Sequence, residues 1–258
     1  MEKNNFSQTE KQDNNFKQTA KQDNFSQIVR QYNYFIQTEK RENRRNYQRE
    51  LEALIKEQEV QPEKKLLLHS CCAPCSSYCM EFLRKHFDVT VFYYNHNITD
   101  SVEYEKRVSD QKRLVQTYNE MAQPAISLIC AEYEPDVFIN AVKGYEACLE
   151  GQERCSICFA LRLSKTAKEA KRLGMDYFTT TLTISPMKNA ALLNEIGERI
   201  AIKEGVGFLP SDFKKKNGYL RSIELSEQYH LYRQNYCGCE FSKKQMEQAH
   251  RTGKDFEI

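Results

Sequence analysis

The 258-residue sequence lacks three features that would each point to a broad class of protein. Its net charge is only +2, so the chain as a whole does not attract polyanions, and contact with nucleic acid depends on local basic patches. It has no signal peptide and no apolar segment long enough to span a bilayer. It also lacks the glycine fingerprint that binds redox coenzymes. We therefore expect a soluble, cytoplasmic protein without membrane contact, and any electrons that it uses would come from an external donor.

Cysteine, in contrast, is abundant. The cytosol keeps thiols reduced, so ten cysteines are more naturally metal or redox ligands than disulfide partners. Seven of them lie in three short motifs: Cys71-Cys72-Ala73-Pro74-Cys75, Cys155-Ser156-Ile157-Cys158 and Cys237-Gly238-Cys239. One tetrahedral zinc site uses only four thiolates. We predict a cluster with either a second metal or redox thiols, and soft thiolates suit both iron–sulfur and zinc centres.

The remaining cysteines, Cys79, Cys130 and Cys148, stand outside paired motifs and are expected to pack in the core. Within the motifs, Cys155 and Cys158 open a predicted helix, whose N-terminus favours thiolate. The glycine between Cys237 and Cys239 is expected to act as a flexible hinge that turns both sulfur atoms toward one centre.

Residues 1–60 differ in composition from the rest of the chain. A polar repeat covers 5–27, with phenylalanine as its only regular apolar residue, which is too sparse to bury a core. We predict a polar leader at 1–60, disordered or partly helical, and a catalytic domain at 61–258. Contact of the leader with RNA is an alternative interpretation.

From residue 66 onward, short apolar runs alternate with helical patterns. The runs predict strands at Leu66–Ser70, Val89–Tyr94, Ile126–Cys130, Tyr177–Thr181 and Val206–Leu209. Helices are predicted after the capping residue Asp100, with apolar spacing as far as Ala122. Two more are predicted through Phe159 to Gly174 and from about Asn189 to Gly205. This alternation predicts an α/β fold with a Rossmann-like, mostly parallel sheet and helices on both faces.

The polar motifs follow the predicted strands. The C-terminal ends of parallel strands share one edge, where open α/β sheets bind their ligands, so we predict a metal site there. Residues of this edge are Cys71 and Cys72, Asn95 and Asn97, the segment Thr180–Lys188, and Asp212–Lys216. Since neighbouring residues of a strand point to opposite faces, Cys71 and Cys72 are expected to serve different centres.

In combination, these motifs resemble the QueH-type epoxyqueuosine reductases over roughly residues 66–241. The residues that carry the resemblance are His69–Cys75, Asn95–Ile98, Glu103-Tyr104 with Arg107, Glu150-Gly151 with Arg154-Cys155 and Cys158-Phe159, Phe178–Leu182 with Ser185-Pro186 and Lys188, Asp212-Phe213, and Asn235–Cys239. The polar leader lies outside the usual domain of the family. His96 stands where proline is expected, which bears on the shape of a substrate loop.

The resemblance implies an oxidoreductase that converts epoxyqueuosine at the wobble position of tRNA into queuosine, the last step of queuosine biosynthesis. It also implies a [4Fe-4S] cluster beside a second iron. The proposed ligands are Cys71, Cys72, Cys155, Cys158, Cys237 and Cys239, with their partition between the two centres open. Asp212 is a candidate ligand or proton donor; the alternative is a helix cap or an ion pair with the lysines after it. Cys75 is either a further ligand or a packing residue.

Basic and amide side chains near the same edge are the candidate contacts with tRNA. They are Asn95, Asn97, Arg107, Lys188, Lys215 within the run Lys214–Lys216, and Arg221. Tyr219 and Tyr236 are available to stack an unpaired base.

Two alternative functions remain at this point. Another cluster-dependent tRNA-modifying enzyme, such as a PP-loop-like thiolation enzyme, would need a glycine-rich phosphate loop after the first strand, and Ser70–Cys75 has no glycine. A non-catalytic, zinc-stabilised RNA-binding protein would leave the excess thiols unexplained.

Overall fold

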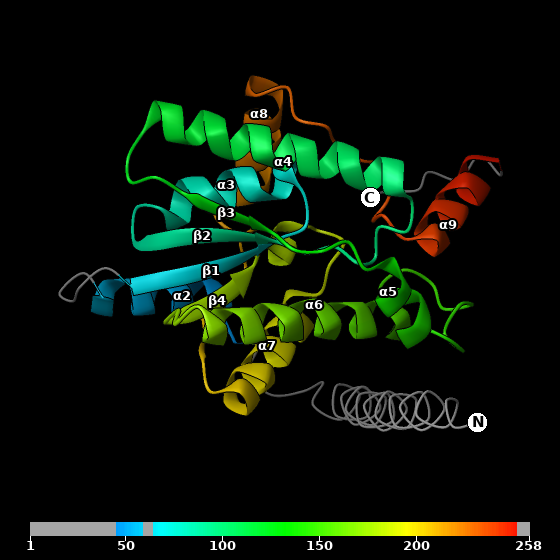
Figure 1. The fold of residues 1–258 in the computed structure, drawn as a ribbon, viewed down its shortest axis with the longest axis horizontal. Helices are drawn as coiled ribbons and strands as arrows, with labels where there is room; N and C mark the ends of the chain where they lie inside the picture. The colour runs from blue at the N-terminus through cyan, green and yellow to red at the C-terminus, as the bar shows by residue number, and fades with distance from the viewer. Residues whose placement is uncertain (1–44, 59–63, 252–258) are drawn as a thin grey trace, which may run out of the picture. The chain divides into compact units, whose positions relative to one another are not determined.

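A parallel five-stranded sheet forms the centre of the protein. The computed structural model describes residues 45–58 and 64–251. The strands are β1 (Lys64–Ser70), β2 (Phe87–Tyr93), β3 (Ser127–Cys130), β4 (Tyr177–Thr180) and β5 (Gly207–Phe208). Their order is β3-β2-β1-β4-β5 (Figure 1), and all four pairings are parallel. The predicted α/β, Rossmann-like architecture is therefore confirmed.

Helices cover both faces of this sheet. They are α2 (Tyr47–Gln58), α3 (Ala73–Leu83), α4 (Ser101–Met121), α5 (Pro135–Ala141), α6 (Glu153–Arg172), α7 (Ala190–Glu204), α8 (Gly218–Gln228) and α9 (Glu240–Arg251), with a 3-10 helix η1 (Thr181–Ile184) after β4. Figure 1 shows α3, α4 and α8 on one side of the sheet and α6 and α7 on the other. None of the helices in the described part of the chain is long and apolar enough to cross a membrane.

The central strand β1 explains the unbroken apolar run of the sequence. It pairs with β2 on one side and with β4 on the other, and helices cover both of its faces, so successive residues are buried. Leu66, Leu67 and Leu68 are all inaccessible to solvent. Leu66 and Leu68 join a cluster with Met80 and Leu114 from α3 and α4. Burying one leucine side chain stabilises the fold by about 1.5–3 kcal/mol.

The ends of the helices follow the signals that the sequence carries. The Asp100 carboxylate accepts hydrogen bonds from the backbone N–H groups of Val102 (3.0 Å) and Glu103 (3.2 Å). Asn189 caps α7 in the same way, and Gly205 ends α7 with a left-handed φ of 70°. The expected buried position of Ala122 is wrong, because α4 ends at Met121 and Ala122 is exposed.

Part of the expected leader is folded. The helix α2 packs Leu51 and Ile55 into the main hydrophobic cluster, and Glu52 forms an ion pair with Lys216 at 2.5 Å. The polar repeat lies outside the described residues, so its structure and the boundary at residue 60 stay predictions.

The connections place a topological switch point between β1 and β4. The chain leaves β1 into α3 on one face of the sheet, whereas α6, which leads into β4, lies on the opposite face (Figure 1). Ligands bind at such switch points, outside the carboxyl ends of the strands.

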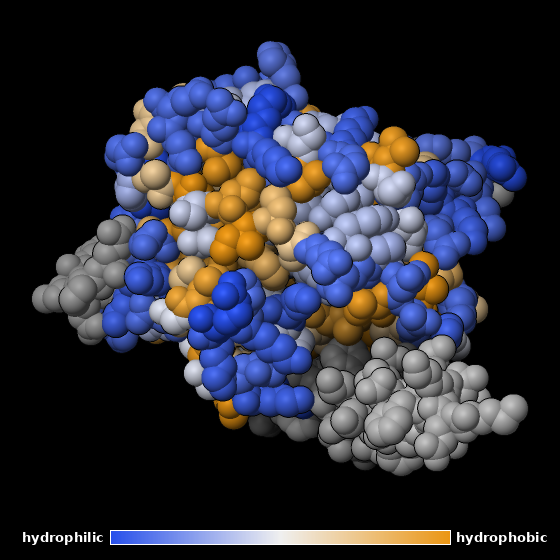
Figure 2. Space-filling view, in the orientation of Figure 1, coloured by the Kyte–Doolittle hydropathy of each residue, from blue (hydrophilic) through white to orange (hydrophobic). Residues whose placement is uncertain are grey.

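The surface in Figure 2 has hydrophilic and apolar regions. Hydrophilic side chains cover α4 and α9, and apolar ones gather between α4 and α6, where the edge strand β3 lies.

Candidate metal centre

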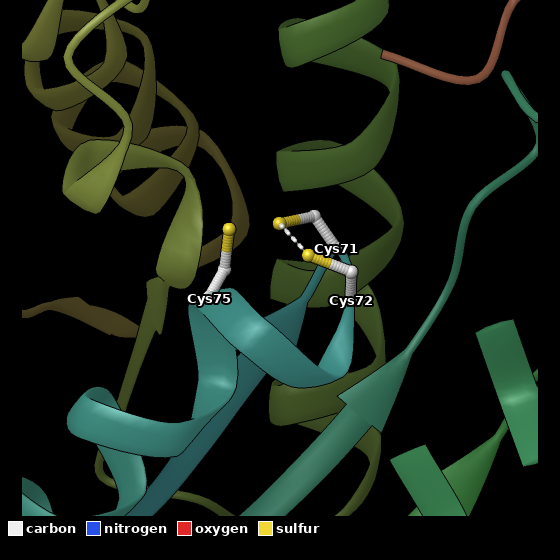
Figure 3. A group of neighbouring side chains, drawn as sticks. All are labelled: Cys71, Cys72 and Cys75. Carbon is white, nitrogen blue, oxygen red and sulfur yellow. Dashed lines mark hydrogen bonds between the residues drawn. The ribbon is translucent and has the colours of Figure 1, made fainter. Parts of the chain in front are cut away.

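Three thiols meet at the carboxyl end of β1. The strand ends at Ser70, Cys72 is the extended N-cap residue of α3, and Pro74 lies in the first turn of that helix. The sulfur atoms of Cys71, Cys72 and Cys75 all lie within 4.8 Å of one another, and they point toward a common centre (Figure 3). The turn between β1 and α3 therefore presents three converging sulfur atoms that could hold a metal ion.

This geometry corrects one expectation and resolves another. The Sγ atoms of Cys71 and Cys72 are 3.7 Å apart, so the prediction that they face opposite sides is wrong. Side-chain alternation requires an extended strand, and the strand has ended one residue before Cys71. Cys75, whose role the sequence left open, lies with the other two thiols rather than beneath them.

Hydrogen bonds from the chain hold these sulfur atoms. The hydroxyl of Thr181, which follows β4, donates to Cys71 Sγ (3.3 Å) and accepts from the Cys71 N–H (3.2 Å). The amide Nε2 of Gln234 donates to Cys72 Sγ (3.1 Å). Donors around Cys72, first the thiols of Cys71 and Cys75, hold its pKa well below the usual range. Hydrogen bonding to its neighbours raises the pKa of Cys75, so of the three thiols Cys72 is the one whose ionised form is favoured.

A buried polar network fixes the strand ends beneath the thiols. The imidazole of His69 bonds Thr180 Oγ1 (2.9 Å) and the carbonyl of Tyr94 (3.0 Å), which links β4, β1 and the end of β2. Burial lowers the pKa of His69 to about 4, so its ring is neutral at pH 7. Asn95 Nδ2 donates to the Ser70 carbonyl (2.9 Å). This hydrogen bond joins the segment after β2 to the end of β1. The predicted contact of Asn95 with substrate stays a prediction.

The other four motif thiols line an adjoining cavity. Cys155 and Cys158 reach it from the start of α6, and Cys237 and Cys239 from the segment before α9. The Gly151 N–H donates to Cys155 Sγ at 3.2 Å. Burial nevertheless raises the pKa of Cys155 to about 11 and that of Cys158 to about 12. The expectation that the helix N-terminus makes these thiols ready thiolates is therefore wrong, because desolvation outweighs the helix dipole.

The two groups of thiols share one region of the molecule. A second cavity, lined by Cys71 and Cys75, meets the first, and Glu150, Lys188 and Cys237 line both. Burial lowers the pKa of Lys188, but negative charge at the Cys237 sulfur atom and the Glu150 carboxylate more than offsets this effect. Lys188 therefore stays a cation between the two cavities.

The Cys237–Cys239 segment is closely packed. Gly238 has a φ of 123°, which side chains other than that of glycine rarely adopt. A Cβ atom added there would lie 2.9 Å from Ile98 Cγ1 and 3.3 Å from Arg107 Nη1. The expected flexible hinge is therefore a site of close backbone approach. Arg107 holds this segment by donating to the carbonyls of Cys237 (3.1 Å) and Tyr236 (3.3 Å).

This set of donors fits a metal centre. All ten cysteines are free thiols, three sulfur atoms converge on one point, and four more line the adjoining cavity. Thiolate is a soft ligand that suits iron–sulfur clusters and zinc.

Comparison with known proteins identifies the family. The sequence model described as Epoxyqueuosine reductase QueH matches residues 66–245. The chain belongs to this epoxyqueuosine reductase family. Proteins named Epoxyqueuosine reductase QueH are similar to it in Staphylococcus aureus (43% identity, 78% of this chain and 85% of the relative) and Streptococcus pyogenes serotype M1 (41%, 77% and 78%). One from Thermotoga maritima is 35% identical over 72% of this chain and 93% of the relative.

Not every candidate contact with tRNA lines the cavities. Asn97, Arg107, Lys188, Tyr219 and Tyr236 do. Lys215 and Arg221 do not, and their positive charges are paired within the chain. Lys215 lies 3.6 Å from Asp212, and Arg221 forms ion pairs with Glu81 (3.1 Å) and Glu224 (2.9 Å). Their contacts with tRNA stay predictions.

Asp212 has partners of its own. Its carboxylate lies 2.9 Å from Lys214 Nζ as well as 3.6 Å from Lys215 Nζ. An ion pair with these lysines was the alternative interpretation of Asp212 in the sequence. Asp212 does not line either cavity. Its proposed role as ligand or proton donor stays a prediction.

His96, at the position where the family motif is expected to have proline, is buried among aromatic rings. Its ring centroid lies 5.0 Å from that of Tyr94 and 5.9 Å from that of Phe138. Within the described part of the chain, neither ring nitrogen has a hydrogen-bond partner, and burial holds its pKa well below the usual range. His96 therefore stabilises the loop before Asn97 as a neutral, packed ring.

The three cysteines outside the motifs differ in environment. Cys79 is completely buried in the main cluster, as expected. Cys148 is half-buried, with its Sγ 3.6 Å from the Glu153 carboxylate. Cys130 is exposed, contrary to expectation, because it ends the edge strand β3.

Two side chains of the site were not foreseen from the sequence: Gln234, which bonds a sulfur atom, and Arg162, which lines the cavity of Cys71. Thr181 was expected at this edge as part of Thr180–Lys188, but its hydrogen bond to Cys71 Sγ was not foreseen. Arg162 carries one signal that could have been used: it follows Cys158 by four residues, which places both on one face of α6.

Proposed function

We propose that the protein reduces epoxyqueuosine in the anticodon of tRNA to queuosine, using a [4Fe-4S] cluster and a second iron held by its thiols. The observation that carries this proposal is the meeting of three motifs at two adjoining, thiol-lined cavities. Family membership supports the reaction, and the number of thiols supports more than one metal centre. A tRNA substrate would place the protein in the cytoplasm.

The proposed ligands are the six thiols of Cys71, Cys72, Cys155, Cys158, Cys237 and Cys239, to which the geometry adds Cys75. Cys71, Cys72 and Cys75 are positioned to bind a single point. Cys237 lines both cavities, so it is close to both groups of ligands.

Removal of the epoxide oxygen takes up two electrons and two protons and yields an alkene and water. The iron centres, when bound, would supply the electrons one at a time together with a Lewis acid for the oxygen. The electrons come from a separate donor, a reduced protein or a chemical reductant.

The chain itself supplies the binding site. Lys188 is protonated and lies between the two cavities. It is positioned there to bind an anionic or hydrogen-bond-accepting group of the substrate. Tyr219 and Tyr236 line the cavity of Cys71, where an unpaired base could stack against a ring. Asn97 and Arg107 hold the Cys237 segment through its carbonyl (3.5 and 3.1 Å), which keeps one wall of the cavity in place.

The direct test is turnover on the proposed substrate. The anaerobically purified protein is incubated with tRNA that bears epoxyqueuosine and a chemical reductant, and the nucleosides are analysed by mass spectrometry. We expect epoxyqueuosine to decrease and queuosine to increase in equal amounts. The matched control is Cys130→Ser, which removes an exposed thiol outside the motifs and should turn over normally. A metal-loaded protein that leaves epoxyqueuosine unchanged would contradict the proposal.

A further inference from the structure

Arg162 is a buried cation at the junction of the thiol groups. It lies on α6, one helical turn after Cys158, and only 2% of the residue is exposed to solvent. It lines the cavity that also contains Cys71, Cys75 and Cys237. Its side chain is thus enclosed by protein at the centre of the candidate site.

No partner within the described residues neutralises this cation. The guanidinium of Arg162 forms no ion pair or hydrogen bond there, and its buried Nε atom is unsatisfied. Arg107 is equally buried but pairs with Glu103 at 2.6 Å and with two backbone carbonyls. A buried, unpaired charge is strongly unfavourable, so the environment of Arg162 is complete only with an anion beside it.

The neighbouring side chains show which anion that is. Burial, and after it the positive charge of Arg162, lowers the pKa values of His69 and His96, and these rings carry no negative charge. Burial lowers the pKa of Arg162, but negative charge at four nearby sulfur atoms, those of Cys158, Cys237, Cys71 and Cys239, more than offsets this effect. These thiols come from all three cysteine motifs. As metal ligands they would be thiolates, and a centre bound by them would carry the missing negative charge.

We propose that Arg162 is the counter-charge of the iron–sulfur centre and raises its reduction potential. This inference rests on the proposed function. When the centre accepts one electron from the external donor, its negative charge grows by one, and no bond or proton has to move. A fixed positive charge in a poorly solvated site stabilises the reduced form more than the oxidised form. Arg162 therefore makes the centre easier to reduce.

The test is a potentiometric titration of the full-length, iron-loaded protein, with iron content measured in parallel. In Arg162→Gln the midpoint potential should fall by at least about 59 mV, which is a tenfold change in the equilibrium constant for one-electron reduction. Arg162→Lys keeps the charge and should stay near the wild-type potential. The matched control is Arg172→Gln on the same helix, whose side chain is 66% exposed, and it should leave the potential unchanged.

Each outcome decides the inference. If Arg162→Gln fails to hold iron whereas Arg162→Lys holds it at the wild-type potential, the role of the charge is supported. An unchanged potential in an iron-loaded Arg162→Gln protein overturns the inference alone, and a selective rise in the KM for tRNA would then assign Arg162 to a substrate phosphate. Equal loss of iron in both variants also overturns it, because shape rather than charge would matter. A wild-type protein without a reducible chromophore overturns both this inference and the proposed function.

Discussion

The two groups of thiols are built in different ways. Cys71, Cys72 and Cys75 lie within five consecutive residues, and a single strand-to-helix turn brings their sulfur atoms within 4.8 Å. Cys155 and Cys158 begin α6, whereas Cys237 and Cys239 precede α9, more than 75 residues later in the chain. Only tertiary packing brings this second group to one cavity. The first group is therefore fixed by local structure, and the second by the fold as a whole.

The two groups also differ in charge. Hydrogen bonds from Cys71, Cys75 and Gln234 favour a thiolate at Cys72. In the second group, burial is the largest influence at Cys155, Cys158 and Cys239, and it favours the protonated thiol. The first group thus contains one thiol, Cys72, whose thiolate is favoured, whereas hydrogen bonding raises the pKa values of Cys71 and Cys75. In the second group no thiol with a lowered pKa stands beside Cys155, Cys158 and Cys239.

Removing a thiol from the first group should have the largest effect. Cys71→Ser replaces a soft ligand in a set of three, so we expect metal content to fall and activity to drop by more than about 100-fold, beyond the loss typical of residues that only orient a ligand. Metal analysis and the epoxyqueuosine assay measure this. Cys237→Ser should be as severe, because Cys237 lines both cavities. Retained iron and turnover in either variant would remove that residue from the site.

Removing the donors around the first group should have the next largest effect. Thr181→Val and Gln234→Leu each remove a hydrogen bond to sulfur, and residues of this kind typically contribute about 10- to 100-fold to metal affinity. Competition with a chelator measures the loss. Thr183→Val is the matched control, because Thr183 lies in the same 3-10 helix but bonds Ser211 (3.0 Å) instead of a thiol. An equal loss in Thr183→Val and Thr181→Val would mean that packing of the 3-10 helix, and not the hydrogen bond from Thr181 to sulfur, sets the metal affinity.

Metal uptake by the second group should depend more steeply on pH. The pKa values of Cys155 and Cys158 are raised from 9.0 to about 11 and about 12, so these thiols hold their protons below pH 9 and must lose them on binding. Affinity therefore rises with pH, by about tenfold per unit for each thiol that ionises. Zinc titrations between pH 6.5 and 8.5, in Cys155→Ser/Cys158→Ser and in wild type, measure the slopes. A slope that the double substitution does not reduce would contradict the comparison.

Gly238→Ala should disturb the second group while sparing the first. A Cβ atom would crowd Ile98 and Arg107, and the φ of 123° adds strain of about 1–3 kcal/mol. We expect a lower melting temperature and weaker metal binding by the Cys237 segment. Gly144→Ala is the control, since Gly144 also has a positive φ (84°) but has no atoms within 4 Å of an added Cβ. If the two variants behave alike, contact with Ile98 and Arg107 is unimportant.

Replacing the lysine run, Lys214–Lys216, should have the smallest effect, and that effect should be on tRNA binding. Lys214, Lys215 and Lys216 are paired with Asp212 and Glu52, so their positive charges are partly neutralised within the chain. Changing all three to Gln should weaken tRNA binding less than Lys188→Gln, which removes a cation between the cavities. Binding measured at several salt concentrations tests this order. If the triple variant has the larger effect, the run is the main contact with the tRNA backbone.

The sequence was sufficient to predict the strands, a parallel sheet whose C-terminal strand ends share one edge, and the thiols that gather at that edge. Apolar runs such as Leu66–Leu68 and caps such as Asp100 act over a few residues, so they can be read from local spacing. Strand alternation failed at Cys71 and Cys72 because the end of β1 could not be located to the single residue on which the direction of the side chains depends.

The partners of charged groups could not be predicted from local sequence. Burial raises the pKa values of Cys155 and Cys158, although their helix position alone suggested the opposite. Lys216 pairs with Glu52 on α2, a residue in the range expected to be a leader. Gln234 reaches Cys72 across 162 positions. Such contacts are set by tertiary packing, which the sequence pattern does not record.

The central claim is that these thiols hold an iron–sulfur cluster and a second iron. Anaerobic purification followed by iron, sulfide and zinc analysis, with optical spectra before and after dithionite, tests it most directly. We expect about five irons and about four sulfides per chain, and a brown absorption band that bleaches on reduction. A colourless protein with stoichiometric zinc and no iron would contradict the claim and would favour a zinc-stabilised RNA-binding protein.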